Sequence, residues 1–424
     1  KMFFKNFKVW ETELAGRKLT LETGKMAGLA NASVMARYGE TNVLCTVTAS
    51  AKPREGVDFF PLSVDYEEKM YSVGKIPGSF QRREGRASEK AILTSRCIDR
   101  PIRPLFPKDL RNDCSVVATV MSVDPDCSPE ITAMIGVSAA IAISDIPWDG
   151  PISGVNVGLV DGQIVINPTL EQRAKSDLVL TVASTADLVA MIEAGGNEID
   201  DDTMFDAIMA GHEENKKIVR FIQGIVDEIG KPKFEYESSN PDPEIMAQIE
   251  EFCIEDVKKA LDTDDKLVRD EALLPIYAAV HEKFDEQFEG NEAKIDEIMY
   301  LVQKHVVRSW LKDEHKRVDG RGIDEIRPLN AEVDLLARAH GSGLFTRGQT
   351  QDLSVTTLGP MSDAQQLDGL DEQTEKRYIH HYNFPSYSVG ETKPSRGPGR
   401  REIGHGALAE KALVPVLPSV DEFP

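Results

Sequence analysis

Three groups of arginines in this sequence have the chemistry to bind phosphate. A guanidinium group stays charged at any working pH, and its planar set of N–H donors matches the oxygens of a phosphate. The groups are the neighbours Arg82 and Arg83, the spaced set Arg96, Arg100 and Arg103, and the neighbours Arg400 and Arg401. We therefore expect an anionic ligand at one or more of these places.

The overall charge of the chain argues against a polyanionic partner, but its distribution does not. The net charge is −22, and residues 241–300 hold eighteen Asp and Glu against six Lys and Arg, which accounts for −12 of it. Residues 82–103 hold seven bases against three acids, and residues 393–401 hold four bases and no acid. These local patches of positive charge are where an anion would bind.

Two of the arginine groups also have an ordinary structural interpretation. Arg400 and Arg401 stand among the glycines 397, 399, 404 and 406, which permit close approach of the backbone to an anion, but they could be surface charges of a loop. Arg96 and Arg100 are four apart on an expected helix that ends near Pro101. With Arg103 they could form an anion pocket, or they could pair with Glu89 or Asp99.

The sequence carries two copies of one pattern. Residues 39–48 resemble residues 348–357, and the Arg-Arg-Glu of residues 82–84 resembles that of residues 400–402. The offsets are 348 − 39 = 309 and 401 − 83 = 318. Motifs in the same order at nearly constant offset indicate a duplicated domain. The second copy ends soon after its helix, so we expect it to be incomplete and the chain to continue normally beyond Pro424.

The expected elements divide the chain into three parts. Residues 1–236 alternate strands (43–48, 115–121), a hairpin (155–160 and 163–166) and a buried helix over 131–143 that begins at Ser128. Residues 237–315 carry apolar stripes of helical spacing, which favour a small helical bundle over a cofactor site. Residues 316–424 hold the second copy.

Several classes of site and location are disfavoured. The five cysteines are odd in number and scattered, so they indicate neither disulfides nor zinc but core filling; they are Cys45, Cys97, Cys114, Cys127 and Cys253. The acidic residues 198–202 are interpreted as a helix N-terminus and not a metal site. With no apolar run of eighteen residues and no signal peptide, we expect a cytoplasmic protein without a membrane partner.

The segments 317–321, 326–329 and 343–350 resemble the start of a ribonuclease PH-type phosphorolytic domain, and residues 380–385, 388–391 and 399–406 extend the match. Residues 76–80 and 98–106 resemble the same domain in the first copy. Two such domains with a helical linker resemble the polynucleotide phosphorylase family. The resemblance implies an α+β fold, with duplicated ribonuclease PH-like (β/α) domains joined by an all-α domain.

The same resemblance implies a function. It implies 3′-to-5′ phosphorolysis of single-stranded RNA, in which inorganic phosphate releases nucleoside diphosphates reversibly. It places Arg400, Arg401 and His405 around the phosphate and the RNA 3′ end. It also implies a Mg²⁺ or Mn²⁺ cofactor with ligands beyond Pro424, so no metal ligand is named, and a homotrimer that could join an RNA-degradation assembly.

In the first copy the resemblance implies an RNA-gripping loop made of Phe80, Gln81, Arg82 and Arg83. Gln81 stands where a second aromatic residue often sits, so hydrogen bonding would replace one stacking contact. The alternative to an enzyme is a catalytically inert RNA-binding ring or scaffold, in which the same arginines only thread RNA.

Overall fold

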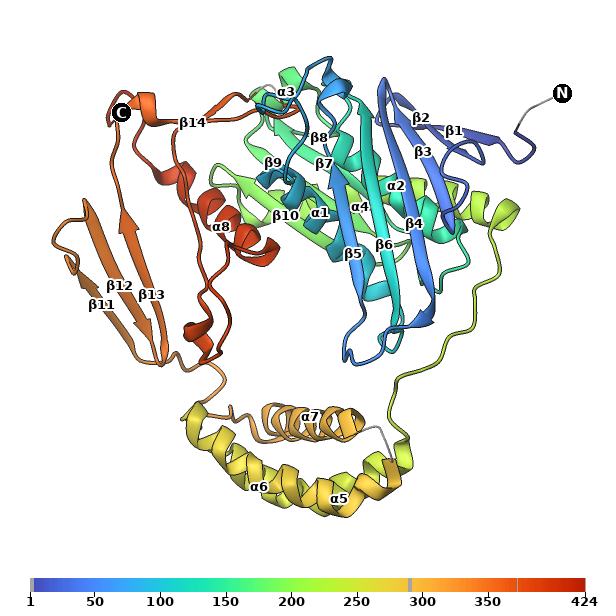
Figure 1. The fold of residues 1–424 in the computed structure, drawn as a ribbon. Helices are drawn as coiled ribbons and strands as arrows, with labels where there is room; N and C mark the ends of the chain where they lie inside the picture. The colour runs from blue at the N-terminus through green and yellow to red at the C-terminus, as the bar shows by residue number, and fades with distance from the viewer. Residues whose placement is uncertain (1–3, 289–291, 372, 424) are drawn as a thin grey trace. The chain divides into compact units, whose positions relative to one another are not determined.

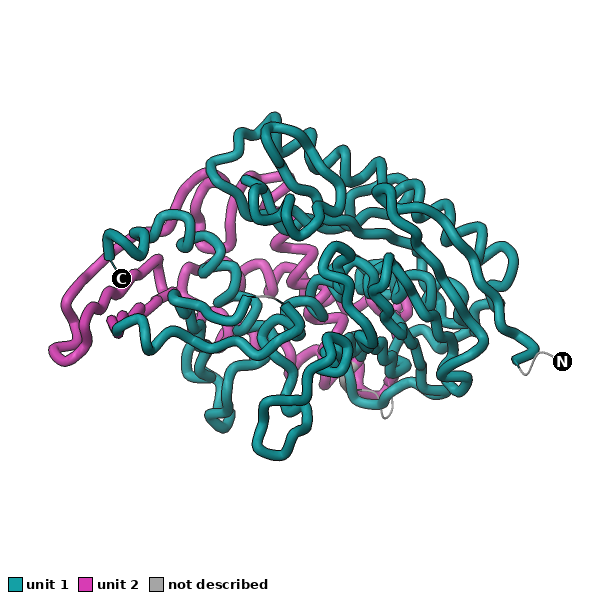
Figure 2. Tube along the Cα trace, turned by 90° about the horizontal axis from the view of Figure 1, so that it is seen from above, with its two compact units in different colours: residues 1–238, 360–424 teal, residues 239–359 magenta. Residues whose placement is uncertain are grey.

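The computed structural model describes residues 4–288, 292–371 and 373–423. The chain divides into two compact units, which Figure 2 shows in two colours. The first unit contains Lys1–Ser238 together with Pro360–Pro424, and the second contains Ser239–Gly359. The last part of the chain therefore packs in one unit with the first copy of the repeat.

The first unit is built on a six-stranded sheet with the order β1-β2-β3-β4-β6-β5 (Figure 1). Neighbouring strands are antiparallel except β5, which runs parallel to β6 at the sheet edge. The strands are β1 (Lys8–Leu14), β2 (Arg17–Thr23), β3 (Ala32–Tyr38), β4 (Thr41–Pro53), β5 (Leu62–Glu67) and β6 (Asn112–Ser122). The predicted strands at 43–48 and 115–121 are confirmed as parts of β4 and β6.

A second, four-stranded sheet has the order β10-β9-β7-β8. Its strands are β7 (Ser153–Val160), β8 (Gln163–Ile166), β9 (Leu178–Ser184) and β10 (Val189–Gly196). The predicted hairpin is confirmed, because β7 and β8 pair in antiparallel register across Asp161 and Gly162. Both turn residues have positive φ, at 51° and 75°, as a tight two-residue hairpin turn of type I′ requires.

Helix α2 (Pro129–Ile143) lies between the two sheets and is buried on all sides. Its residues from Ile131 to Ile143 are apolar or small around the whole helix, which is why no face needs solvent. Gly136 lets it approach β4, since a Cβ there would lie 2.6 Å from the Sγ of Cys45. The predicted start is confirmed, because the Ser128 hydroxyl accepts a hydrogen bond from the N–H of Ile131 at 3.2 Å.

Three further helices complete the first copy: α1 (Glu89–Ile102), the short α3 (Leu170–Ala174) and α4 (Asp201–Ile229). Helix α4 packs on β7 and β9. The side chain of Asp200 accepts from the N–H of Thr203 at 2.9 Å, so the prediction of an acidic helix N-terminus is confirmed. All five cysteines are free, with four buried and Cys97 half-buried, and they fill the core as expected.

The second unit contains the predicted helices, α5 (Pro243–Leu261), α6 (Lys266–Phe284) and α7 (Glu292–Ser309). The apolar stripe of α7 and the turn after it is buried as predicted; its members are Ile295, Ile298, Met299, Val302, Val306 and Trp310. Phe252 on α5 is an exception among the apolar residues of these helices, since it is 41% exposed. The Lys283 Nζ lies 4.0 Å from the centre of the Phe252 ring.

The second unit ends in an antiparallel sheet of β11 (Leu329–Val333), β12 (Gly341–Arg347) and β13 (Thr350–Thr356).

Matching elements recur in the two copies. The turn glycines Gly39 and Gly348, between β3 and β4 and between β12 and β13, have positive φ of 55° and 60°. Helix α1 and helix α8 (Arg400–Leu413) each have 14 residues, and each is followed by a 3₁₀ turn, at Arg103–Leu105 and Val414–Val416. The helix offset is 400 − 89 = 311 and the 3₁₀ offset is 414 − 103 = 311.

This offset corrects one part of the predicted repeat. The Arg-Arg-Glu of residues 82–84 lies in the loop before α1, whereas that of residues 400–402 forms the first turn of α8. The equivalence between these two triplets is therefore wrong. The counterparts of Arg400 and Arg401 in the first copy are Glu89 and Lys90, because the loops before the two helices differ in length.

Candidate active site

Arg400 and Arg401 are the first two residues of α8, and Gly399 precedes them as the N-cap without a side-chain cap. The interpretation of these arginines as part of a loop is therefore wrong. The first N–H groups of a helix have no partner within it and attract anions, whereas cations there are unfavourable to the helix dipole. Two guanidinium groups at this end are unfavourable for the helix alone, but together with the free N–H groups they favour an anionic ligand.

The two arginines have different surroundings. The Arg400 Nη1 donates a hydrogen bond to the backbone oxygen of Val64 at 2.6 Å, and its Nη2 pairs with the carboxylate of Asp65. Both partners belong to β5 in the first copy. Arg401 is exposed, and no hydrogen bond or ion pair reaches its guanidinium from residues 4–288, 292–371 or 373–423. Arg400 is held, whereas Arg401 is available to a ligand.

His405 lies one turn after Arg401, so the two side chains share a face of α8. Its ring stacks on Tyr382, with ring centres 5.2 Å apart and planes at 20°, and Tyr382 stacks in turn on Phe384. None of the described residues forms a hydrogen bond to this ring. The stacking fixes the ring plane and leaves its nitrogens open.

The glycines of this segment act in packing. A Cβ on Gly404 would lie 2.5 Å from the Nε of Arg96, and a Cβ on Gly406 would lie 3.2 Å from the backbone oxygen of His380. The two glycines therefore let α8 contact α1 on one side and residues 380–382 on the other. We expected them to allow approach to an anion, but in the folded chain they allow approach of the helix to its neighbours.

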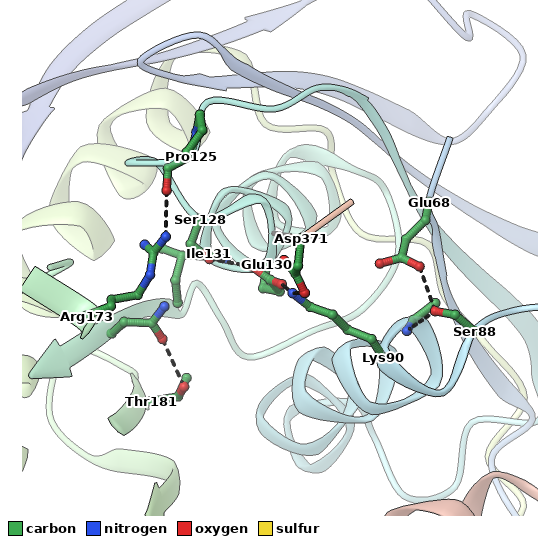
Figure 3. Close-up of polar contacts among 12 residues, drawn as sticks. Glu68, Ser88, Lys90, Pro125, Ser128, Glu130, Ile131, Arg173, Thr181 and Asp371 are labelled. Carbon is green, nitrogen blue, oxygen red and sulfur yellow. Dashed lines mark hydrogen bonds and ion pairs between the residues drawn. The ribbon is translucent and has the colours of Figure 1, made fainter. Parts of the chain in front are cut away.

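The counterpart of Arg401 in the first copy, Lys90, is neutralised within the protein (Figure 3). Its Nζ lies 2.8 Å from Oε1 of Glu130 and also pairs with Asp371. Burial alone would lower the pKa of Lys90, but the two carboxylates outweigh burial and raise the pKa. The Ser128 hydroxyl donates to Glu130 at 2.6 Å. The chain itself therefore supplies counter-charges to Lys90, whereas none of the described residues supplies one to its counterpart Arg401.

The other predicted anion-binding arginines are engaged in the first unit. Arg103 donates two hydrogen bonds of 2.6 Å to Asp99, which is one of the two alternatives raised from the sequence. The Arg100 Nη1 lies 3.3 Å from Oε2 of Glu193, and Arg96 packs against Gly404 of α8. The three side chains therefore lie along α1 and the turn after it with separate neighbours.

The predicted RNA-gripping loop is exposed throughout. Phe80 is 102% exposed, and Gln81, Arg82 and Arg83 are exposed beside it. The Ser79 hydroxyl donates to the backbone oxygen of Arg83 at 2.7 Å, and Arg82 has a positive φ of 52°. The loop is therefore held in a bend at its base while its aromatic ring and guanidinium groups face solvent.

Sequence reasoning missed four carboxylates that organise this region: Asp65, Glu130, Glu193 and Asp371. Each of them pairs with a base that is far away in sequence, such as Asp65 with Arg400 and Glu193 with Lys411 at 2.8 Å. No local motif marks such residues. The one available signal for Asp65 is a carboxylate between the apolar residues Val64 and Tyr66, which is a weak signal because such alternation is common.

The described residues offer no ready metal site and no membrane span. No group of three or more His, Cys, Asp or Glu side chains among them is placed to hold a metal ion. Among the helices of the described ranges, none combines the length and apolarity needed to cross a bilayer.

Glu68 belongs to the same polar cluster as Lys90 and generates a testable prediction. The Ser88 hydroxyl donates to its Oε2 at 2.6 Å, and burial raises the pKa of Glu68 despite that bond and the charge of Lys90. A raised pKa in the folded state means that the ionised carboxylate destabilises the fold above the ordinary glutamate pKa of about 4.3. Glu68→Gln should therefore melt at a higher temperature than wild type at pH 7.

The gain should shrink as the pH falls toward 4, because Glu68 is then neutral in the wild-type protein as well. Thermal unfolding followed by circular dichroism across this pH range measures it. Glu55→Gln, at an exposed position between β4 and β5, is the matched control and should show no such pH-dependent gain. A Glu68→Gln protein less stable than wild type at pH 7 would contradict the prediction.

Comparison with known proteins identifies the parts of the chain. Residues 15–147 and 325–424 both match the family model of the 3′ exoribonuclease family, domain 1, and residues 150–214 match domain 2 of that family. Residues 244–322 match the model of the polyribonucleotide nucleotidyltransferase RNA binding domain. Because one model matches both copies, the predicted fold class, with duplicated domains and a helical region between them, is confirmed.

Curated relatives agree with these matches. The polyribonucleotide nucleotidyltransferases of Ruminiclostridium cellulolyticum and Lachnoclostridium phytofermentans are both 60% identical to this chain, over 418 and 420 residues respectively. Each match covers 99% of this chain. That of Caldicellulosiruptor saccharolyticus is 57% identical over 417 residues, covering 98% of this chain. The chain spans 60% of the length of each of these three relatives. A solved structure, rice (Oryza sativa) Rrp46, is 15% identical, with a TM-score of 0.40 and coverage of 53% of this chain and 95% of that one.

The predicted resemblance is thereby confirmed. More than half of the chain matches one family model in two separate copies, and the intervening helices match the domain that accompanies it in polyribonucleotide nucleotidyltransferases. The chain belongs to the 3′ exoribonuclease family.

Proposed function

We propose that this chain supplies the core of a 3′-to-5′ phosphorolytic exoribonuclease, which uses inorganic phosphate to shorten RNA and releases nucleoside diphosphates. The observation that carries the proposal is that Arg401 and His405 lie on one exposed face of α8. Neither side chain has a hydrogen-bonding partner among the described residues. The relatives, which are named polyribonucleotide nucleotidyltransferases, support the same reaction class.

The reaction demands fixed positive charge. An oxygen of inorganic phosphate forms a bond to the 3′-terminal phosphorus of RNA, while the bond from that phosphorus to the 3′ oxygen of the preceding nucleotide breaks. That 3′ oxygen leaves with a proton. Two anionic groups must approach each other, so catalysis depends on neutralisation and positioning. A phosphoanhydride replaces a phosphodiester, so the reaction runs in both directions.

We assign Arg401 to binding the phosphate groups. Arg400, which is anchored to β5, is assigned to the same phosphate-binding site. His405 is assigned to contact a phosphate oxygen or the leaving oxygen. The open ring nitrogens of His405 can donate a hydrogen bond or a proton to either group. A divalent cation, Mg²⁺ or Mn²⁺, is the proposed cofactor, and the described residues offer it no ligand set. When bound, such a cation neutralises charge on the phosphate oxygens, while the arginines and the histidine bind and orient them.

The two copies have different roles in this proposal. Lys90 is already paired with Glu130 and Asp371, whereas Arg401 is unpaired among the described residues, so we assign chemistry to the second copy and RNA binding to the first, through Phe80, Gln81, Arg82 and Arg83. Arg96 and Arg100 on α1, with Arg103 in the turn after it, are proposed as secondary anion contacts. The proposed domains are residues 1–236, 237–315 and 316–424, with the second copy in the last of them.

We also propose a homotrimer, in which exposed loops from several copies meet around one axis, and membership of an RNA-degradation assembly. The fully exposed Phe80 supports a loop that contacts RNA jointly with other copies. A cytoplasmic location is supported by five free cysteines, which are typical of a reducing compartment.

The decisive experiment is to incubate the protein, produced at the full length of its relatives, with poly(A), inorganic phosphate and magnesium. We expect phosphate-dependent release of ADP and shortening from the 3′ end, and synthesis of poly(A) from ADP in the reverse direction. Binding of poly(A) without any ADP release would instead favour a catalytically inert RNA-binding ring or scaffold.

Charge reversal tests the arginine pair. Arg400→Asp and Arg401→Asp should each lower kcat/KM for phosphorolysis by more than the roughly 30- to 800-fold that corresponds to about 2–4 kcal/mol for one lost charged contact. Arg220→Asp, at an exposed position on α4, is the matched control and should keep wild-type activity. Near-normal turnover in both pair variants, with the fold intact by circular dichroism, would refute the assignment.

The RNA-gripping loop has a separate test in the salt dependence of binding. Replacing Arg82 and Arg83 with Ala should weaken long single-stranded RNA far more than a dinucleotide. Each lost phosphate contact should reduce the slope of log K against log salt by about 0.7. Fluorescence anisotropy at several salt concentrations measures the slope, and an unchanged slope would place both arginines off the RNA path.

A further inference from the structure

The first copy reaches into the proposed active site of the second through β5. Arg400 contacts two consecutive residues of this strand, the backbone oxygen of Val64 at 2.6 Å and the carboxylate of Asp65. These positions are 336 and 335 residues away in sequence. No other hydrogen bond or ion pair of the Arg400 guanidinium is found among the residues that the structure describes.

The position of β5 explains how both contacts form. It is the edge strand of the six-stranded sheet, so carbonyl groups on its outer side have no neighbouring strand within that sheet. Val64 and Tyr66 point into the core, whereas Asp65 lies on the opposite face of the strand and is half-buried. A planar guanidinium can bond an edge carbonyl and a carboxylate together, which fixes its orientation as a lysine could not.

Arg400 keeps donors for a ligand while it is held. A guanidinium has five N–H donors, and the two contacts to β5 leave others free. The side chain of Arg400 is 48% exposed, so these donors face solvent. Arg400 is the first residue of α8, so its contacts to β5 tie down the start of the helix that also carries Arg401 and His405.

We propose that Asp65 is a positioning residue of the active site: it orients the Arg400 guanidinium and the first turn of α8 from the other copy of the repeat. The inference rests on the proposed function and deepens it. Asp65 touches no substrate in this scheme and acts only through Arg400. The duplication then has a mechanistic consequence, because one copy carries the phosphate-binding arginines and the other fixes their geometry.

A double-mutant cycle tests the proposal in the full-length protein, with ADP release from poly(A) as the assay. Asp65→Ala should lower kcat by roughly tenfold to a hundredfold, with a smaller change in the KM for phosphate, and Asp65→Glu should recover part of the loss. In an Arg400→Ala background, Asp65→Ala should cause no further loss. Glu67→Ala, on the same face of β5 and paired with Lys69, is the control and should leave kcat unchanged.

Two results would overturn the proposal while the proposed function stands. The first is a normal kcat in the Asp65→Ala protein while the Arg400→Ala protein is impaired. The second is an equal loss of kcat from Asp65→Ala in the wild-type and in the Arg400→Ala background. If the wild-type protein releases no ADP, the proposed function fails instead. Hydrogen exchange at the hydrogen-bonded N–H groups of α8, from Ile403 onward, then tests whether Asp65 holds the start of the helix, and unchanged exchange there in Asp65→Ala would overturn the proposal.

Discussion

The geometry of the candidate site depends on the close packing of helix α8 against the first copy. Gly404 leaves room for Arg96 of α1, because a side chain there would displace the end of that arginine. At the far end of α8, Lys411 pairs with Glu193 at 2.8 Å, and Glu193 also contacts Arg100. Arg100 and Lys411 are equivalent positions of the two copies, because they are separated by the repeat offset of 311 residues (100 + 311 = 411). The carboxylate of Glu193 on β10 therefore contacts the same position in both copies. The candidate site lies at the other end of this anchored helix.

The two copies share elements but differ in electrostatics. Lys90 is paired with Glu130 and Asp371, whereas its counterpart Arg401 has no partner in the described chain. The Lys90 side chain is 41% exposed, and its two carboxylates come from both copies, Glu130 from the first and Asp371 from the second. The second copy leaves its charge for a ligand. This difference in pairing is the basis of the different roles that we propose.

The uneven charge of the chain suits the proposed substrate. Residues 241–300 carry −12 of the total −22, while exposed arginines gather at the loop before α1 and at the start of α8. A polyanion would be repelled most by the acidic segment 241–300 and attracted at these places. The match of residues 244–322 to an RNA binding domain model is compatible with this acidic character, since phosphate contacts need only a few local bases.

The sequence by itself determined the elements whose cause is local. The period of the apolar residues, the Ser128 cap and the Asp161-Gly162 turn specify the helices and the hairpin through contacts within a few residues. The arginines and His405 could be found in the same way, since their types and motifs stand in the sequence. The Arg-Arg-Glu triplets at residues 82–84 and 400–402 are not equivalent in the fold, because identical residues do not reveal the length of the loop before a helix.

Only the tertiary structure decided which of these charges are available. Arg400 is held by Asp65, Lys90 by Glu130 and Asp371, and Arg100 by Glu193, and each pairing joins segments that are distant in the sequence. A charge is neutralised by whatever lies within about 4 Å of it, and that neighbour is set by the packing of sheets and helices. Availability for a ligand is therefore a property of the folded chain and not of any motif.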